Sequence, residues 1–124
     1  MNILYVEDNE TDADILVRTL AKTAPDMKVD WVKACGAALD KLKACAAETP
    51  MYDLLLTDIE LSDGEGSSPV SFVQQNNLPV AVVIITGMGT EEAAVAALKA
   101  GISDYVAKQE GYLARLPNIL QTAV

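Results

Sequence analysis

Apolar runs alternate with amphipathic stretches along the chain, and the alternation occurs five times. The predicted strands are residues 2–6, 28–33, 54–56, 80–85 and 104–107. Unbroken apolar runs such as 54–56 and 80–85 are typical of central parallel strands that are buried on both faces. The alternating residues of 28–33 are typical of an edge strand with one covered face. The pattern therefore predicts an α/β fold in which helices cover both faces of a parallel sheet.

Helix signals lie between the predicted strands. Asn9 precedes a stretch whose first turn carries Glu10 and Asp12, and an asparagine cap followed by acidic residues favours a helix start. Further helices are expected at about residues 35–47 and from about residue 110 onward.

Glycine, serine and proline mark two further segments. The stretch between Asp63 and Asn77 begins with glycines and serines, so we expect a long loop and then a short helix that starts at Pro69. Thr90 precedes an alanine-rich stretch that ends at Gly101, which predicts a fourth helix.

Length and charge narrow the class of protein. A chain of 124 residues fits one domain, spanning residues 1–124, with a real core. No apolar run approaches the roughly 20 residues that span a bilayer, and the N-terminus lacks the features of a signal peptide, so we expect a cytoplasmic protein. A net charge of −9 argues against direct binding to nucleic acid or to an anionic membrane, because both require basic patches.

Histidine is absent from the chain. Its absence excludes histidine-dependent nucleophile systems, His-ligated zinc and autophosphorylation on histidine. Cys35 and Cys45 are ten residues apart, which fits neither a CxxC motif nor a zinc site, so we expect reduced and packed thiols. Any chemistry must therefore use carboxylates, lysine, threonine or a bound cation.

Polar residues follow four of the predicted strands. Glu7 and Asp8 end the first strand, Asp58 the third and Thr86 the fourth, and the fifth strand runs into Lys108. Each residue taken alone has a structural explanation, as a helix cap, a turn residue or a surface lysine. Because ligands of parallel α/β sheets bind beyond the carboxyl ends of the strands, their joint placement at one edge indicates a functional site.

The chemistry of these residues suits phosphoryl groups. Carboxylates about 4 Å apart repel by roughly 4 kcal/mol near a protein surface, so a cation is expected among them. Hard oxygen ligands select Mg²⁺ or Mn²⁺ over zinc. A cation, the ammonium group of Lys108 and the hydroxyl of Thr86 around Asp58 would stabilise phosphoryl oxygens, with Asp58 as the nucleophile.

Three segments of the chain resemble the receiver domain of response regulators in two-component signalling. They are ILYVEDNETDADIL, DLLLTDIELSDGEG and VVIITGMGTEEAAVAALKAGISDYVAK, which match its opening, its phosphoacceptor strand with the following loop, and its closing half. The resemblance covers essentially the whole chain. It implies a flavodoxin-like, doubly wound sheet of five parallel strands in the order 2-1-3-4-5.

The resemblance also implies the metal ligands. Glu7 and Asp8 match the acidic pair of the family, with Asp8 as the more direct ligand of Mg²⁺. Asp58 matches the phosphoacceptor, which also binds the metal. The backbone carbonyl of Glu60 would supply a further ligand.

Three other residues match positions that hold the phosphoryl group or respond to it. Thr86 matches the hydroxyl residue that grips a phosphoryl oxygen, and Lys108 matches the lysine that pairs with the phosphoryl group. Tyr105 matches the switch aromatic, which turns inward when the threonine is drawn toward phosphate. Gln109 departs from the family pattern, which usually has proline after the lysine. This departure removes no catalytic group.

By this resemblance the chain is a regulatory phosphoacceptor domain, which catalyses only its own phosphorylation and dephosphorylation. A histidine kinase or a histidine phosphotransfer domain would be the donor. The response would pass to the face made by the fourth helix, fifth strand and fifth helix, where an output domain or a second copy of the chain would bind. The ending KQEGYLARLPNIL resembles receivers that lead into a further region, so we expect the N-terminal part of a larger signalling protein.

Three alternatives stay open on the sequence. A metal-dependent phosphatase of the haloacid dehalogenase type is suggested by Asp58 and Glu60 after an apolar strand, although its motif belongs on the first strand. A flavodoxin-like module would hold FMN phosphate after the first strand, where acidic residues here would repel it. The third alternative is a receiver-fold scaffold that is never phosphorylated.

Overall fold

A computed structural model of the chain describes residues 1–47, 52–58, 60–61, 64–65, 67–87, 92, 96, 99, 101–109 and 111–124. Its strands are β1 (Asn2–Val6), β2 (Lys28–Val32), β3 (Leu54–Asp58), β4 (Glu60–Leu61), β5 (Gly64–Glu65), β6 (Ala81–Thr86) and β7 (Asp104–Ala107). Its helices are α1 (Glu10–Thr23), α2 (Cys35–Ala47), α3 (Ser67–Gln75) and α5 (Tyr112–Ala123). The predicted helix between Thr90 and Gly101 lies largely outside the described residues.

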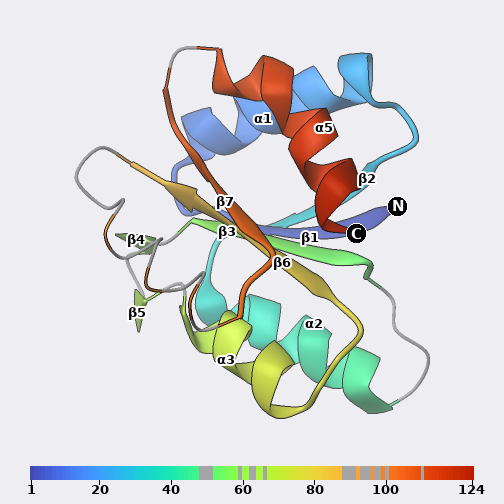
Figure 1. Cartoon of the computed structure of the whole chain (residues 1–124), viewed down its shortest axis with the longest axis vertical. Coiled ribbons are helices and arrows are strands. Elements are labelled where there is room, and N and C mark those ends of the chain that lie inside the picture. The colour runs from blue at the N-terminus through green and yellow to red at the C-terminus, as the bar shows by residue number, and fades with distance from the viewer. Residues whose placement is uncertain are drawn as a thin grey trace.

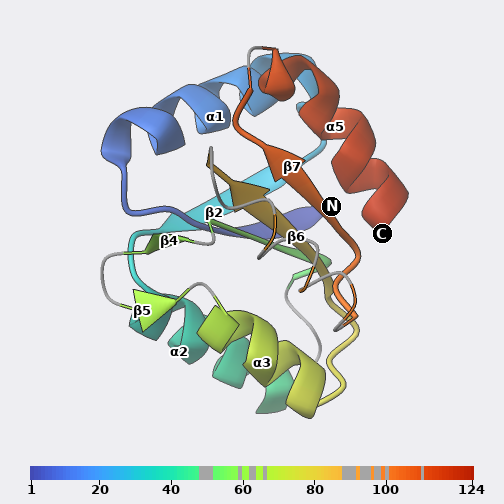
Figure 2. The same cartoon turned by 60° about the vertical axis from the view of Figure 1, so that its left-hand side comes forward.

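Five strands form one parallel sheet in the order β2-β1-β3-β6-β7. Helices α1 and α5 cover one face, and α2 and α3 cover the other (Figures 1 and 2). The predicted fold class and strand order are therefore confirmed, since these strands are the first to fifth of the predicted sheet in chain order.

Alternating side chains of each strand supply two separate cores. On β1, Ile3 and Tyr5 pack in the layer under α1 and α5, whereas Leu4 and Val6 pack in the layer under α2 and α3. All five residues of β3 are buried, as the unbroken apolar run predicts. Each large aliphatic side chain buried in this way contributes about 1.5–3 kcal/mol to folding.

The junction of β1 and α1 follows the expected cap. The side chain of Asn9 accepts a hydrogen bond from the backbone N–H of Asp12 at 3.0 Å, which satisfies one of the N–H groups that a helix start leaves unpaired. This bond fixes the first turn of α1 beside the carboxyl end of β1.

The segment between β3 and α3 differs from the prediction. The described residues include a short antiparallel pair, β4 and β5. Strand β5 lies in the stretch after Asp63 where a loop was expected, and β4 lies just before it. The helix begins at Ser67, so the prediction that it starts at Pro69 is wrong. Proline is tolerated there because the backbone N–H groups of a first helical turn have no partner within the helix.

No helix of the described part is long and apolar enough to cross a membrane. Helix α5 begins at Tyr112, close to the expected start near residue 110, and it contains Pro117. Cys35 is buried within the core under α2 and α3, in line with a packed thiol. The side chain of Cys45 lies outside the described residues.

Candidate functional site

The carboxyl ends of the central strands bring three of the predicted residues together. Glu7 follows β1, Asp58 ends β3 and Lys108 follows β7. The register of β1 with β3, which pairs Tyr5 with Leu56 and Val6 with Thr57, places Glu7 opposite Asp58. Alternation directs both carboxylates toward the face covered by α1 and α5.

Lys108 joins these carboxylates to a third one. Its Nζ atom lies 2.8 Å from Glu7 Oε1, 2.9 Å from Asp58 Oδ2 and 2.9 Å from Asp12 Oδ2. An ammonium group has three donors, so each donor has one carboxylate acceptor. Such charge-assisted bonds are about twice as strong as neutral ones. Burial alone lowers the pKa of Lys108, but the bonds to Asp12, Glu7 and Asp58 outweigh burial and raise it.

Glu7 is held at every polar atom. Its side chain is only 1% exposed, and Oε2 accepts from the backbone N–H of Asn9 at 3.3 Å. Its backbone N–H donates to the carbonyl of Val32 at 3.1 Å, and its carbonyl accepts from the indole N–H of Trp31 at 2.8 Å. Burial and the nearby charge of Asp58 raise the pKa of Glu7 to about 7, although Lys108 opposes this shift.

Thr86 lies at the end of β6 and is fully buried. Its carbonyl accepts from the backbone N–H of Lys108 at 2.8 Å, so the two residues are tied together. Its hydroxyl has no hydrogen-bond partner among the described residues. A buried hydroxyl in that condition is costly, and it suits a donor that completes its bond with a ligand.

Tyr105 shares a face of the sheet with Thr86. The register pairs Ile84 with Tyr105 and Thr86 with Ala107, so the two side chains are diagonal neighbours on adjacent strands. Tyr105 is half-buried against the core under α2 and α3. Its predicted role as a switch stays a prediction.

Asp8 and Glu60 lie beside this cluster in the chain. Asp8 is half-buried in the β1–α1 loop directly after Glu7. Glu60 lies in β4, two residues after Asp58, and its side chain is outside the described part. Their roles as metal ligands stay predictions.

The donor set suits a hard cation. Carboxylates and a backbone carbonyl are ligands of Mg²⁺ and Mn²⁺, and the chain has no histidine for a zinc site. No three acidic or cysteine side chains of the described residues are arranged as a ready metal site. The ammonium group of Lys108 links Glu7 and Asp58. A cation that binds both carboxylates therefore competes with Lys108 for them.

Two site residues were missed by the sequence reasoning, Asp12 and Trp31. Asp12 had been assigned only to the helix dipole. Leu16 and Leu20 follow it by four and eight residues and are buried, so Asp12 lies on the inward stripe of α1 at its site end. That spacing was the available signal. No pattern of residues in the sequence indicates that the indole of Trp31 would contact a backbone carbonyl.

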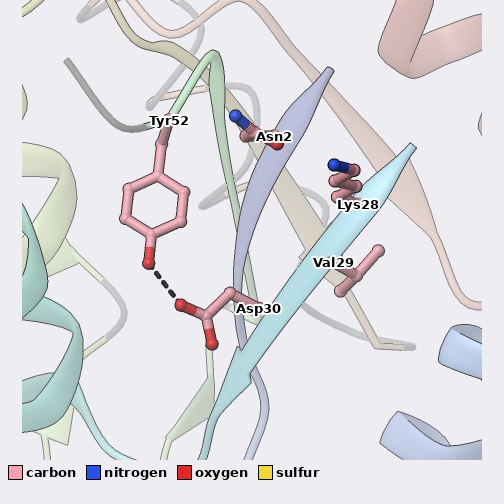
Figure 3. A pocket seen from close by; sticks show the side chains of 5 residues that line it. All are labelled: Asn2, Lys28, Val29, Asp30 and Tyr52. Carbon is pink, nitrogen blue, oxygen red and sulfur yellow. Dashed lines mark hydrogen bonds between the residues drawn. The ribbon is translucent and has the colours of Figure 1, made fainter. Parts of the chain in front are cut away.

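A second group of polar side chains lies at the amino ends of β1 and β2. A hollow of about 280 Å³ is lined by Asn2, Lys28, Val29, Asp30 and Tyr52 (Figure 3). The hydroxyl of Tyr52 donates to Asp30, and Lys41 Nζ lies 3.0 Å from the same carboxylate. These contacts tie β2 to α2 and to Tyr52, which lies two positions before β3. The hollow lies at the opposite sheet edge from the Lys108 cluster.

Comparison with known proteins agrees with the fold described above. The family model described as response regulator receiver domain matches residues 3–120. The chain is 34% identical over 121 residues to the response regulator protein PilR of Pseudomonas aeruginosa, which covers 98% of this chain and 25% of PilR. It is 30% identical over 107 residues to the photosynthetic apparatus regulatory protein RegA of Rhodovulum sulfidophilum, which covers 86% of this chain and 55% of RegA.

Among solved structures, the response regulator protein TrrA of Thermotoga maritima, in complex with Mg²⁺ and BeF, has a TM-score of 0.80 and 18% identity. The match covers 99% of this chain and 98% of that one. The chain thus shares the fold of TrrA along nearly all of its length, and it spans a quarter of PilR and about half of RegA.

Proposed function

The chain belongs to the response regulator receiver domain family, and on that premise we propose that Asp58 accepts a phosphoryl group from a histidine kinase or a histidine phosphotransfer domain. The observation that carries the proposal is the 2.9 Å contact between Lys108 Nζ and Asp58 Oδ2. It places a positive charge beside a buried carboxylate, at the sheet edge where parallel α/β folds bind ligands.

In the proposed transfer, an oxygen of Asp58 attacks the phosphorus atom of a phosphohistidine. A P–O bond forms, the P–N bond breaks, and its electron pair stays on the histidine nitrogen of the donor. Lys108 pairs with one phosphoryl oxygen and the hydroxyl of Thr86 donates to another, so both stabilise the charge that shifts during transfer. Attack of water on phosphorus later restores the carboxylate and releases inorganic phosphate.

The carboxylates of Glu7, Asp8 and Asp58 and the backbone carbonyl of Glu60 would hold Mg²⁺, or Mn²⁺ in its place. When bound, the cation neutralises charge on the phosphoryl oxygens and on the clustered carboxylates. The magnesium complex of TrrA, whose fold this chain shares, supports the proposal.

The output of the domain is binding at the face that includes β7 and α5. Thr86 and Tyr105 connect the phosphoryl site with this face, because they are neighbours across β6 and β7. Movement of the Thr86 hydroxyl toward a phosphoryl oxygen would change the packing of Tyr105 and bias a two-state equilibrium. An output domain or a second copy of the chain would bind there, in the cytoplasm.

The phosphatase alternative is not favoured, because the family match spans residues 3–120 and its relatives are regulatory proteins. A second alternative is a receiver fold that is not phosphorylated. The gain of a phosphoryl group by Asp58 distinguishes the proposed function from this alternative.

Intact-protein mass spectrometry after incubation with acetyl phosphate tests the proposal. Wild type should gain the mass of one phosphoryl group in the presence of Mg²⁺ and none with a chelator. Asp58→Asn should gain none, because an amide oxygen is a poor nucleophile for phosphorus. Asp14→Asn is the matched control, since Asp14 is an exposed carboxylate on α1 that pairs with Arg18.

Two results would count against the assignment. Labelling that persists in Asp58→Asn would place the phosphoryl group on another residue. A folded wild-type protein that gains no mass with Mg²⁺, and also forms no stable adduct with beryllium fluoride, would identify an unphosphorylated scaffold.

A further inference from the structure

The three carboxylates around Lys108 differ in their access to solvent. The side chain of Glu7 is 1% exposed and that of Asp58 is 9% exposed, whereas that of Asp12 is 38% exposed. Lys108 itself is 21% exposed. The ammonium group therefore lies between two inner carboxylates and one at the rim of the site.

The two inner carboxylates have a second use in the proposed function. Glu7 and Asp58 would bind the divalent cation, and a cation between them repels the ammonium group that now bonds both. Lys108 then loses two of its three partners. Its long, flexible side chain allows its ammonium group to swing between acceptors at small cost. Among the described residues, Asp12 is the only remaining carboxylate that contacts Nζ.

Helix α1 holds Asp12 firmly in this position. The backbone N–H of Asp12 donates to Asn9 Oδ1 at 3.0 Å, inside the first turn of the helix. Leu16 and Leu20, on the same stripe, are buried against the sheet. Asp14 lies two residues further along α1 and pairs with Arg18 at 3.1 Å. Asp12 and Asp14 are thus two carboxylates on the same turn of α1. Asp12 contacts Lys108, whereas Asp14 pairs with Arg18 and can serve as a control for Asp12.

We propose that Asp12 is a positioning residue for Lys108, which keeps the ammonium group at the rim of the site when a divalent cation takes the carboxylates of Glu7 and Asp58. The inference rests on the proposed function, because it assumes that the cation binds these two side chains. Without Asp12, displacement of Lys108 would leave its ammonium group with no carboxylate among the described residues, so Lys108 would compete more strongly with the cation. Asp12 thereby tunes the cation affinity of the site.

A Mg²⁺ titration of the intact chain tests the proposal. The chain contains a single tryptophan, and the indole of Trp31 bonds the carbonyl of Glu7 at 2.8 Å, so its fluorescence reports on the site. Asp12→Asn should raise the Mg²⁺ dissociation constant about fivefold, the upper range for a partly exposed ion pair. Asp12→Glu should restore affinity to within about twofold, because it keeps a carboxylate within reach of Nζ.

Two controls separate positioning from a plain loss of charge. Asp14→Asn removes the same charge from the same helix turn and should change the dissociation constant by less than about twofold. In a Lys108→Met background, Asp12→Asn should have no larger effect than Asp14→Asn, because there is no ammonium group left to position.

An equal effect of Asp12→Asn with and without Lys108 would overturn the proposal, and so would equal effects of Asp12→Asn and Asp14→Asn in the wild type. Failure of the proposed function gives a different result. In that case the wild-type protein binds no Mg²⁺ and takes no phosphoryl group from acetyl phosphate, which overturns both proposals together.

Discussion

At the scale of single residues, two buried tyrosines differ in whether their hydroxyl has a partner. Tyr5 is 0% exposed in the core under α1 and α5, and its hydroxyl has no hydrogen-bond partner among the described residues. Burial, together with the charge of Glu7, raises the pKa of Tyr5, so the phenol stays neutral. Tyr52 is 6% exposed, and its hydroxyl donates to the carboxylate of Asp30. That bond lowers the pKa of Asp30.

Removing the two hydroxyl groups should change stability in opposite directions. Tyr5→Phe should raise the free energy of unfolding by about 1–3 kcal/mol, because it deletes a buried polar group that is not satisfied. Tyr52→Phe should lower it by about 1.5–3 kcal/mol, because it breaks a bond to a charged acceptor. Urea denaturation of both variants with a chelator present measures the two changes. A loss of stability in Tyr5→Phe would mean that its hydroxyl is bonded in solution.

At the scale of the elements, the edge strand β2 holds the backbone of Glu7 in place, although β2 itself supplies no carboxylate to the site. Its carbonyl at Val32 accepts from the N–H of Glu7 at 3.1 Å, and its Trp31 indole donates to the Glu7 carbonyl at 2.8 Å. Both backbone groups of Glu7 are therefore held by β2. The β1–α1 loop, which also carries Asp8, starts from this fixed residue.

Trp31→Phe tests this contribution, because it keeps an aromatic ring against the core and removes the indole donor. We expect the Mg²⁺ dissociation constant to rise about fivefold, which corresponds to the roughly 1 kcal/mol of one hydrogen bond. Calorimetric titration is the measurement, since the variant lacks tryptophan. Val29→Ala on the same strand should lower stability and leave the Mg²⁺ affinity unchanged. If both variants weaken Mg²⁺ binding equally, general loosening of β2 explains the effect.

The elements themselves were largely predictable from the sequence. Strands β1 and β7 have the predicted bounds, because short apolar runs between polar residues have sharp ends. The start of α3 was misplaced, since Pro69 is compatible with more than one position in a first turn. The β4–β5 pair was not foreseen, because two residues per strand are too few to show an alternating pattern.

The site was predictable only where the fold alone determines it. Glu7, Asp58 and Lys108 were found because parallel strands end at one edge, and that rule needs only the strand bounds. The contacts of Asp12 and Trp31 depend on the position of a helix stripe and on the reach of an indole group. Such distances arise from packing between layers, which hydrophobic periodicity does not specify.

At the scale of the whole molecule, the chain has a net charge of −9, and three of its carboxyl groups surround the ammonium group of Lys108. The chain has no histidine, so few groups change charge between pH 5 and 8. Among the described residues Glu7 is the exception, because burial raises its pKa from 4.5 to about 7. A single buried carboxyl group should therefore dominate the pH dependence of stability in that range.

The metal-free protein should lose stability as the pH rises from about 5 to about 7.5. Between the usual pKa of 4.5 and the raised value of about 7, folded Glu7 holds a proton that the unfolded chain has released. Stability therefore falls with rising pH, by at most about 3 kcal/mol at roughly 1.4 kcal/mol per pH unit, and levels off above pH 7.5. Urea denaturation at several pH values with a chelator measures the slope, and Glu7→Gln should flatten it. With saturating Mg²⁺ the slope should flatten, because the bound cation keeps folded Glu7 ionised throughout this pH range, as it is in the unfolded chain. A metal-free slope that Glu7→Gln leaves unchanged would assign the pH dependence to other groups.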